Sequence, residues 1–232
     1  VKNAINAFGV KNLIGTFAPP LAVVNDTTLL TSLSPRDWRA GLSESIKVGL
    51  LKDPALVNTI EASVPALLAR DLDAMEAIVM RSADLHIAHI VHGGDPFEFH
   101  QARPLDFGHW SAHCLEYMTG FRLSHGDAVG IGMLIDLQYA ALQEGRSNQM
   151  VQRISDCLGL LGFPLHCDAM GDEERLLEGL ERFREHLGGP LAITLVHAPG
   201  VTQEVDVIDE DCMRQAIRLV ARRGTQHASQ AG

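Results

Sequence analysis

Apolar residues recur at helical spacing through most of the chain. Leu42, Ile46 and Leu50 form one such stripe, and Ser34-Pro35 before it is typical of a helix N-cap followed by proline at the first helical position. The pattern predicts helices over residues 35–52, 54–69, 71–92, 109–119, 125–144, 148–161, 172–187 and 210–223. We therefore expect a mainly α-helical domain.

Two short apolar runs predict β-strands, Leu21–Val24 and Leu191–Val196. Because one strand cannot stand alone, each run needs partners that this sequence hardly offers. We expect both to belong to a sheet whose other strands lie before Val1, so that the chain is a fragment of a longer protein. The polar residues 225–232 are expected to fray.

Composition narrows the function classes. The net charge of −10, with 46% hydrophobic and 21% charged residues, is typical of a globular protein and argues against a general nucleic-acid binder. The sequence shows neither a membrane-spanning apolar run nor a signal peptide at its start. The four cysteines are scattered without a CxxC pair, which favours a reducing, cytoplasmic compartment over a disulfide framework.

Histidine is the unusual residue, with 11 copies, and it is the commonest metal ligand among side chains. His109 and His113 lie one turn apart on a predicted helix, and His125 begins the next one. Glu44, within a predicted helix near its apolar stripe, is the best third ligand for an open metal site. Lys47, one turn on, is an alternative partner for Glu44.

Plainer interpretations remain beside this one. A histidine near a helix start is often a cap or a core group, and Glu44 with Lys47 can be a simple ion pair. The row His86, His89 and His92 favours a polar helix face over a metal site. The opening GVKN lacks the GxxxxGK[ST] pattern of a phosphate-binding loop.

Taken together, four ordered motifs resemble the 3-dehydroquinate synthase family and its wider group of sugar-phosphate cyclases. The motifs are KNAIN…GVKNLIG, RAGLSESIKVGL, FGH with a second histidine four residues on, and LSHGDAVGIGM. The resemblance implies a helical metal-binding domain over residues 34–224, preceded by one or two strands, within residues 1–33, of an α/β NAD-binding domain that is otherwise not in this chain. It also implies a homodimer.

The resemblance assigns roles to individual residues. Glu44, His109 and His125 match the ligands of a divalent metal, zinc or cobalt. Lys47, His113 and Glu98 match catalytic residues. Substrate-binding positions are Asn12, Lys2, Asp106 and Arg103, and cofactor-binding positions are Lys2, Lys11, Leu29, Leu30, Thr31 and Ser32.

The chemistry implied is that of a lyase acting on a small sugar phosphate. The family oxidises a ring hydroxyl with NAD, eliminates phosphate, reduces the ketone again and closes the ring by an intramolecular aldol reaction. Lys47 beside the metal would stabilise oxyanion charge, and His113 would contact the leaving phosphate. Because NAD is regenerated in each turnover, there is no net redox change.

Several positions depart from the family pattern of true 3-dehydroquinate synthases. Ala88 and Ala102 stand where a lysine and an arginine hold the substrate carboxylate, with Arg103 one step off register, and Asp106 replaces an asparagine. Arg184-Glu185-His186 replaces phosphate-binding lysines. Losing positive charge at a carboxylate site disfavours an anionic group there. We therefore lean towards a sedoheptulose 7-phosphate substrate, as in 2-epi-5-epi-valiolone synthases.

Three alternatives stay open. One is a true 3-dehydroquinate synthase, with Arg103 taking over the carboxylate. Another is a metal-dependent NAD alcohol or polyol dehydrogenase, in which Asp106 and three histidines would bind the metal. The third is a non-catalytic helical module that keeps the metal for stability.

Overall fold

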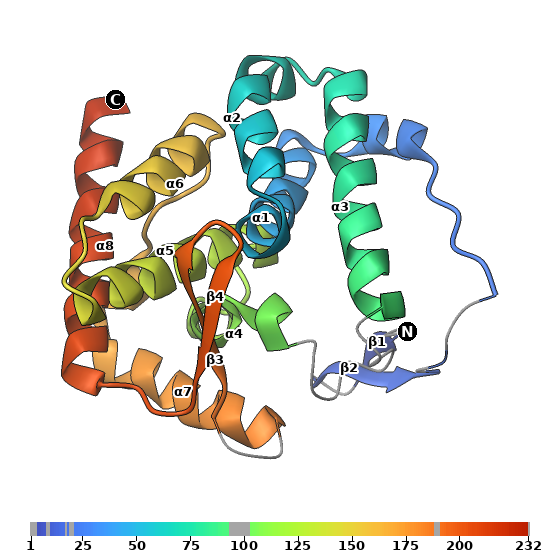
Figure 1. Cartoon of the computed structure of the whole chain (residues 1–232). Helices are drawn as coiled ribbons and strands as arrows, with labels where there is room; N and C mark the ends of the chain where they lie inside the picture. Colours follow the sequence, from blue (N-terminus) through green and yellow to red (C-terminus); the bar gives the residue numbers. More distant parts are fainter. Residues whose placement is uncertain are drawn as a thin grey trace.

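The computed structural model describes residues 4–7, 10–16, 18, 21–92, 103–187 and 191–231. Helices dominate these residues (Figure 1). The helices are α1 (Pro35–Lys52), α2 (Pro54–Leu68), α3 (Leu72–His92), α4 (His109–Met118), α5 (His125–Gln143), α6 (Gln149–Leu160), α7 (Glu173–Leu187) and α8 (Glu210–Ala231). Short 3-10 helices cover η1 (Thr27–Ser32), η2 (Arg103–Asp106) and η3 (Asp168–Gly171). The prediction of a mainly α-helical domain is confirmed.

Local capping explains why the helix starts could be predicted. The Ser34 side chain accepts a hydrogen bond from the Asp37 N–H at the start of α1, and Ser124 does the same for Asp127 at the start of α5. Asp53 ends α1 and caps α2 by accepting from the Ala55 N–H. Each cap is decided by residues within one helical turn, which is why it is visible in the sequence.

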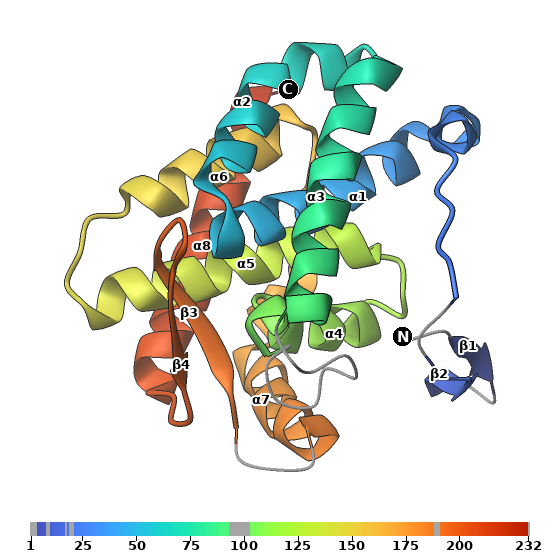
Figure 2. The ribbon, with the colours of Figure 1, turned by 45° about the vertical axis from the view of Figure 1, so that its right-hand side comes forward.

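Helix α5 is the centre of the molecule. Every residue of α5 from Gly126 to Ala140 is buried, and α1, α4, α6, α8 and a β-hairpin pack against it (Figure 2). The largest fully buried side chains include Trp110, Phe107 and Leu42, which lie on or beside these neighbouring helices. Most of the buried α5 residues are apolar, as expected for a helix enclosed by others, and the polar exceptions are Asp127, Asp136 and Gln138.

The second predicted strand belongs to a hairpin. Strand β3 (Ile193–Ala198) pairs antiparallel with β4 (Val201–Val205) and packs against α5. The expectation that this run has hardly a partner in the sequence is therefore wrong, because β4 pairs with it. In the described residues it shares no sheet with β1 and β2. The sequence analysis did not predict strand β4, because its residues are mostly exposed and form no apolar run. Only its backbone pairing to β3 defines it.

The prediction of a strand at Leu21–Val24 is also wrong. Residues 21–26 form no strand, and Leu21, Val23 and Val24 are exposed. The N-terminal strands are instead β1 (Ala4–Ala7) and β2 (Val10–Gly15), an antiparallel hairpin that both views show apart from the central helices (Figures 1 and 2). An apolar run indicates a strand only where a partner strand is at hand.

Helix α8 continues to Ala231, whereas the sequence pattern predicted its end near Arg223. All four cysteines are free. Among the described helices, none combines the length and apolar character that crossing a bilayer requires.

Candidate metal centre

Helix α1 carries the acidic ligand candidate and its basic neighbour. The Glu44 Oε2 atom lies 2.6 Å from the Lys47 Nζ, and the Lys47 side chain is only 6% exposed. The ion pair considered as an alternative role for Glu44 is therefore present. It occupies only one carboxylate oxygen, because Glu44 Oε1 is buried and has no hydrogen-bond partner.

His109 begins α4 directly after a glycine in a left-handed conformation, Gly108, whose φ is 77°. The loop before it is fixed by a buried carboxylate. Asp136 on α5 accepts a 2.8 Å hydrogen bond from the Gly108 N–H and a 2.7 Å bond from Trp110 Nε1. The Nδ1 atom of His109 lies 3.1 Å from the Phe107 carbonyl oxygen. A carbonyl can only accept, so Nδ1 carries the proton and Nε2 keeps its lone pair.

His125 is placed by the close crossing of α1 and α5. A Cβ atom on the next residue, Gly126, would lie 2.2 Å from the Ala40 carbonyl oxygen, so only glycine permits this approach. Glu44 lies one turn beyond Ala40 on α1. The crossing therefore brings Glu44 next to His125 at the start of α5.

These three helices bring the predicted ligands together. Glu44 Oε1 lies 3.6 Å from His109 Nε2 and 3.5 Å from His125 Nε2. One ligand atom from each of the three residues lies within 4.8 Å of the others. Glu44 and His125 side chains are 39% and 38% exposed, against 12% for His109, so the cluster is open on one side.

The protonation states suit metal binding. Burial by itself would raise the pKa of Glu44, but the contact with His125 and the Lys47 charge outweigh it and hold the pKa well below its usual range. Burial, with the Lys47 charge, lowers the pKa of His109 to about 3. At neutral pH, Glu44 is thus a carboxylate and His109 a neutral imidazole, the forms that bind a divalent metal.

The residues present fit a divalent metal ion. A buried, negatively charged oxygen without a hydrogen-bond partner is costly unless something else satisfies it. Two imidazole nitrogens and one carboxylate oxygen are the donor set that zinc accepts, and three protein ligands with an open side are typical of catalytic sites rather than closed structural ones. The described residues outside this region contribute no such group, and His86, His89 and His92 are not part of one.

One site residue was missed by the sequence analysis. Glu116, buried on α4, lies with its Oε2 atom 3.1 Å from Nδ1 of both His113 and His125. His113 itself is 44% exposed and its ring centroid is 5.5 Å from that of His109. The i,i+3 spacing of His113 and Glu116 was the available signal, but nothing local indicates the second contact, with His125 on another helix.

Several of the other predicted site residues lie outside the part of the chain that the structure describes. Lys2 and Glu98 lie outside the described residues, as do the side chains of Lys11, Asn12 and Arg103. Asp106 is partly buried at the end of η2 and is not one of the grouped ligand candidates.

The predicted cofactor segment Leu29–Ser32 forms most of η1. Arg70 donates hydrogen bonds to the carbonyl oxygens of Thr31, at 3.3 Å, and Leu33, at 2.8 Å. The Arg70 guanidinium also lies 5.1 Å from the ring centroid of Trp38. The helical body thus holds this segment in place.

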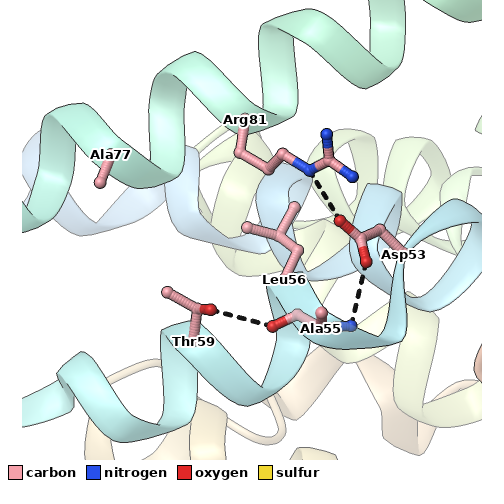
Figure 3. A pocket seen from close by; sticks show the side chains of 6 residues that line it. All are labelled: Asp53, Ala55, Leu56, Thr59, Ala77 and Arg81. Atoms are coloured by element: carbon pink, nitrogen blue, oxygen red, sulfur yellow. Dashed lines mark hydrogen bonds and ion pairs between the residues drawn. The ribbon is translucent and has the colours of Figure 1, made fainter.

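A hollow of about 330 Å³ lies elsewhere, between α2 and α3 (Figure 3). Within it, Asp53 pairs with Arg81 at 2.7 Å and Thr59 Oγ1 donates a hydrogen bond to the Ala55 carbonyl. None of the predicted site residues lines it.

Comparison with known families gives two matches along the chain. The family profile described as 3-dehydroquinate synthase C-terminal matches residues 41–185, and the one described as 3-dehydroquinate synthase N-terminal matches residues 1–40.

Curated relatives carry two different names. A 3-dehydroquinate synthase of Xylella fastidiosa is 32% identical over 234 residues, covering 98% of this chain and 58% of the relative. A 2-epi-valiolone synthase of Actinosynnema mirum is 29% identical over 220 residues, covering 93% of this chain and 57% of the relative. The chain thus spans less than three fifths of the length of these relatives.

A solved structure has the same fold. The 2-epi-5-epi-valiolone synthase from Streptomyces hygroscopicus subsp. jinggangensis, with NAD+ and Zn2+ bound, matches with a TM-score of 0.82 and 24% identity. The match covers 92% of this chain and 59% of that chain. At this identity the likeness establishes the fold alone.

Proposed function

Because the chain belongs to the 3-dehydroquinate synthase family, we propose that it forms the metal- and substrate-binding part of an NAD-dependent sugar-phosphate cyclase. The observation that carries the proposal is the open cluster of Glu44, His109 and His125 with its unpartnered carboxylate oxygen. A purely structural metal site would be closed by a fourth protein ligand.

In this proposal Glu44, His109 and His125 hold a divalent metal, zinc or cobalt. When bound, the metal supplies a Lewis acid for the substrate hydroxyls, and NAD supplies a hydride acceptor that returns the hydride later in the cycle. The net reaction is loss of phosphate by β-elimination followed by intramolecular aldol closure, which makes the enzyme a carbon–oxygen lyase.

Residues of this chain bind the substrate, stabilise the charge that develops on it and contact the leaving phosphate. The buried Lys47 ammonium, next to Glu44, stabilises negative charge that develops on the substrate oxygen. The half-exposed His113 ring contacts the leaving phosphate. Glu98 is the further catalytic residue, and the substrate is bound by Asn12, Lys2, Asp106 and Arg103.

The NAD contacts in this proposal are those implied by the resemblance to the 3-dehydroquinate synthase family. Lys2, Lys11 and η1 residues Leu29, Leu30, Thr31 and Ser32 face NAD. Support comes from η1 itself, where Leu29 is 68% exposed while Arg70 holds the backbone, so the segment is both fixed and accessible. The rest of the NAD site belongs to an α/β domain to which residues 1–33 contribute. The whole protein is a cytoplasmic homodimer in this proposal.

The substrate is a seven-carbon ketose phosphate, with sedoheptulose 7-phosphate favoured. Ala88 lies exposed on α3 and offers no charge, and Ala102 likewise has no positive group for a carboxylate. The relative named 2-epi-valiolone synthase supports this preference. The relative named 3-dehydroquinate synthase keeps the shikimate-route substrate as the second candidate.

Phosphate release tests the proposal. The whole protein is supplied with NAD and zinc or cobalt, and sedoheptulose 7-phosphate and the 3-deoxy-heptulosonate phosphate of the shikimate route are compared side by side. We expect release from the first substrate without net NADH formation. Release from the second alone would make this a 3-dehydroquinate synthase, and net NADH without phosphate release would make it a dehydrogenase.

A double variant tests the proposed substrate preference. Ala88→Lys combined with Ala102→Arg restores the two positive positions of the family pattern. We expect kcat/KM to shift towards the carboxylate-bearing substrate, because a paired carboxylate gains charge-assisted hydrogen bonds. An unchanged ratio between the two substrates would contradict this explanation of the preference.

A further inference from the structure

Glu116 contacts two site histidines through a single oxygen. Its Oε2 atom lies 3.1 Å from His113 Nδ1 and 3.1 Å from His125 Nδ1. The two rings are nearly parallel, with centroids 5.6 Å apart and planes inclined by 20°. The Glu116 side chain is 9% exposed, against 44% and 38% for the histidines, so the carboxylate lies beneath the rings.

The chemistry of these contacts decides which nitrogen carries the proton on each ring. An ionised carboxylate only accepts hydrogen bonds, so the Nδ1 atoms facing Glu116 are the donors. The other nitrogen of each ring, Nε2, is then the one left to bind a metal or the substrate. For His125 this Nε2 is the atom that lies 3.5 Å from Glu44 Oε1, inside the metal cluster.

Resting on the function proposed above, we propose that Glu116 is a positioning residue that sets the tautomer and orientation of both histidines at once. It holds His125 with Nε2 towards the metal. It holds His113 so that the half-exposed edge of that ring is available to the substrate. One buried carboxylate thereby links the metal ligand to the phosphate-contacting residue.

A carboxylate that hydrogen-bonds the other ring nitrogen of a metal-binding histidine raises the basicity of that histidine and restricts its orientation. Loss of such a carboxylate commonly lowers metal affinity about 10- to 100-fold. A competing explanation is that Glu116, His113 and His125 hold a second ion, because these three also lie within 4.8 Å of one another. The two explanations differ in the number of ions bound per chain.

The test uses the whole protein and two variants, Glu116→Ala and Glu116→Gln. Zinc affinity and stoichiometry are measured by competition with a chromophoric chelator. Histidine tautomers are measured in the metal-free protein by 15N chemical shifts, assigned with His113→Asn and His125→Asn. The matched control is Glu144→Gln, because Glu144 also pairs with a histidine, His197, at 2.9 Å but lies outside the site.

We expect one zinc per chain and an affinity loss of about 100-fold in Glu116→Ala, with about 10-fold in Glu116→Gln, whose carbonyl can still accept a hydrogen bond. The metal-free wild type should show His113 and His125 protonated at Nδ1, and Glu116→Ala should lose this preference. Glu144→Gln should match the wild type.

Two results would overturn the inference. One is an unchanged tautomer preference at both histidines in Glu116→Ala, which requires no metal and therefore separates this inference from the proposed function. The other is binding of two ions per chain with loss of one in the variant. If the wild type bound no zinc but showed the Glu116-dependent tautomers, the proposed function would fail while the positioning role would stand.

Discussion

The two oxygens of Glu44 have different neighbours, and this division is the basis of the site. Oε2 pairs with the Lys47 ammonium, while Oε1 faces the Nε2 atoms of His109 and His125. The lysine helps to keep the carboxylate ionised without occupying the oxygen that a metal would need. Sequence spacing alone left these two roles as competing interpretations of Glu44, whereas the structure accommodates both.

We predict that His109→Ala loses bound metal stoichiometrically. The ring contributes one of only three protein ligands, and its Nε2 lone pair is directed by the hydrogen bond of Nδ1 to the Phe107 carbonyl. Metal content after gel filtration is the measurement. His86→Ala, which removes an exposed histidine from α3, is the matched control and should keep its metal. Full occupancy in His109→Ala would contradict the assignment.

Asp136 is predicted to make stability depend on pH. Burial raises the pKa of this carboxyl to about 7, although the hydrogen bonds from Trp110 and Gly108 oppose the rise. A raised folded-state pKa contributes stability that is fully present below the unfolded value near 3.8 and is lost as pH rises through 7. The free-energy advantage of the wild type over Asp136→Asn should therefore be larger at pH 5 than at pH 8.

Urea unfolding at several pH values measures this difference. Asp84→Asn, at an exposed position on α3, is the control and should follow the wild type throughout. A wild-type advantage that is the same at pH 5 and pH 8 would mean that Asp136 does not titrate in this range.

At the scale of elements, the site depends on two places where backbones nearly touch. A Cβ on Gly126 would lie 2.2 Å from the Ala40 carbonyl, and one on Gly132 would lie 2.0 Å from the Gly108 carbonyl. The first contact sets α1 against α5, and the second sets the loop before α4 against α5. Both glycines lie in the segment HGDAVGIGM, whose glycine spacing is therefore a packing requirement as well as a family motif.

We predict that Gly126→Ala destabilises the fold and weakens metal binding together. The added methyl group forces α1 and α5 apart, and such overpacking typically costs about 1–3 kcal/mol. Gly41→Ala on α1 is the matched control, since nothing lies within 4 Å of its Cβ position, and it should gain about 0.5–1 kcal/mol from reduced backbone freedom. Thermal unfolding and zinc titration report the two effects.

A Gly126→Ala protein with wild-type stability and affinity would show that the helix crossing does not set the site geometry.

At the scale of the whole molecule, the ligand candidates come from α1 and from the consecutive helices α4 and α5, which lie far from α1 in the sequence. A metal held by all three would link the central helix to two of its neighbours. Binding to the native state alone stabilises a protein by about 2.7 kcal/mol at a free metal concentration one hundred times Kd.

We therefore predict that zinc raises Tm of the wild type and that a chelator reverses the rise. His109→Ala should show neither change, because it lacks the ligand set. Differential scanning calorimetry with and without excess zinc is the measurement. An equal rise in Tm in the variant would mean that zinc stabilises the protein through another site.

The sequence by itself determined the helices and the residue types of the site. Helix starts at Ser34, Asp53 and Ser124 depend on hydrogen bonds within a single turn, and apolar periodicity over a dozen or more residues is a strong signal. The ligand candidates Glu44, His109 and His125 could be named from the motifs, and the described geometry brings them together as expected.

Contacts between residues of different elements were decided only by the tertiary structure. The second contact of Glu116, the burial of Asp136 beneath the loop before α4, and the pairing of β3 with β4 all join residues from different elements. The failed strand at Leu21–Val24 has the same cause, because a strand exists only with its partner. The sequence pattern within a segment decides whether that segment is a helix. Strand pairing, and carboxylates that contact residues of two elements, depend instead on which segments the fold brings close together.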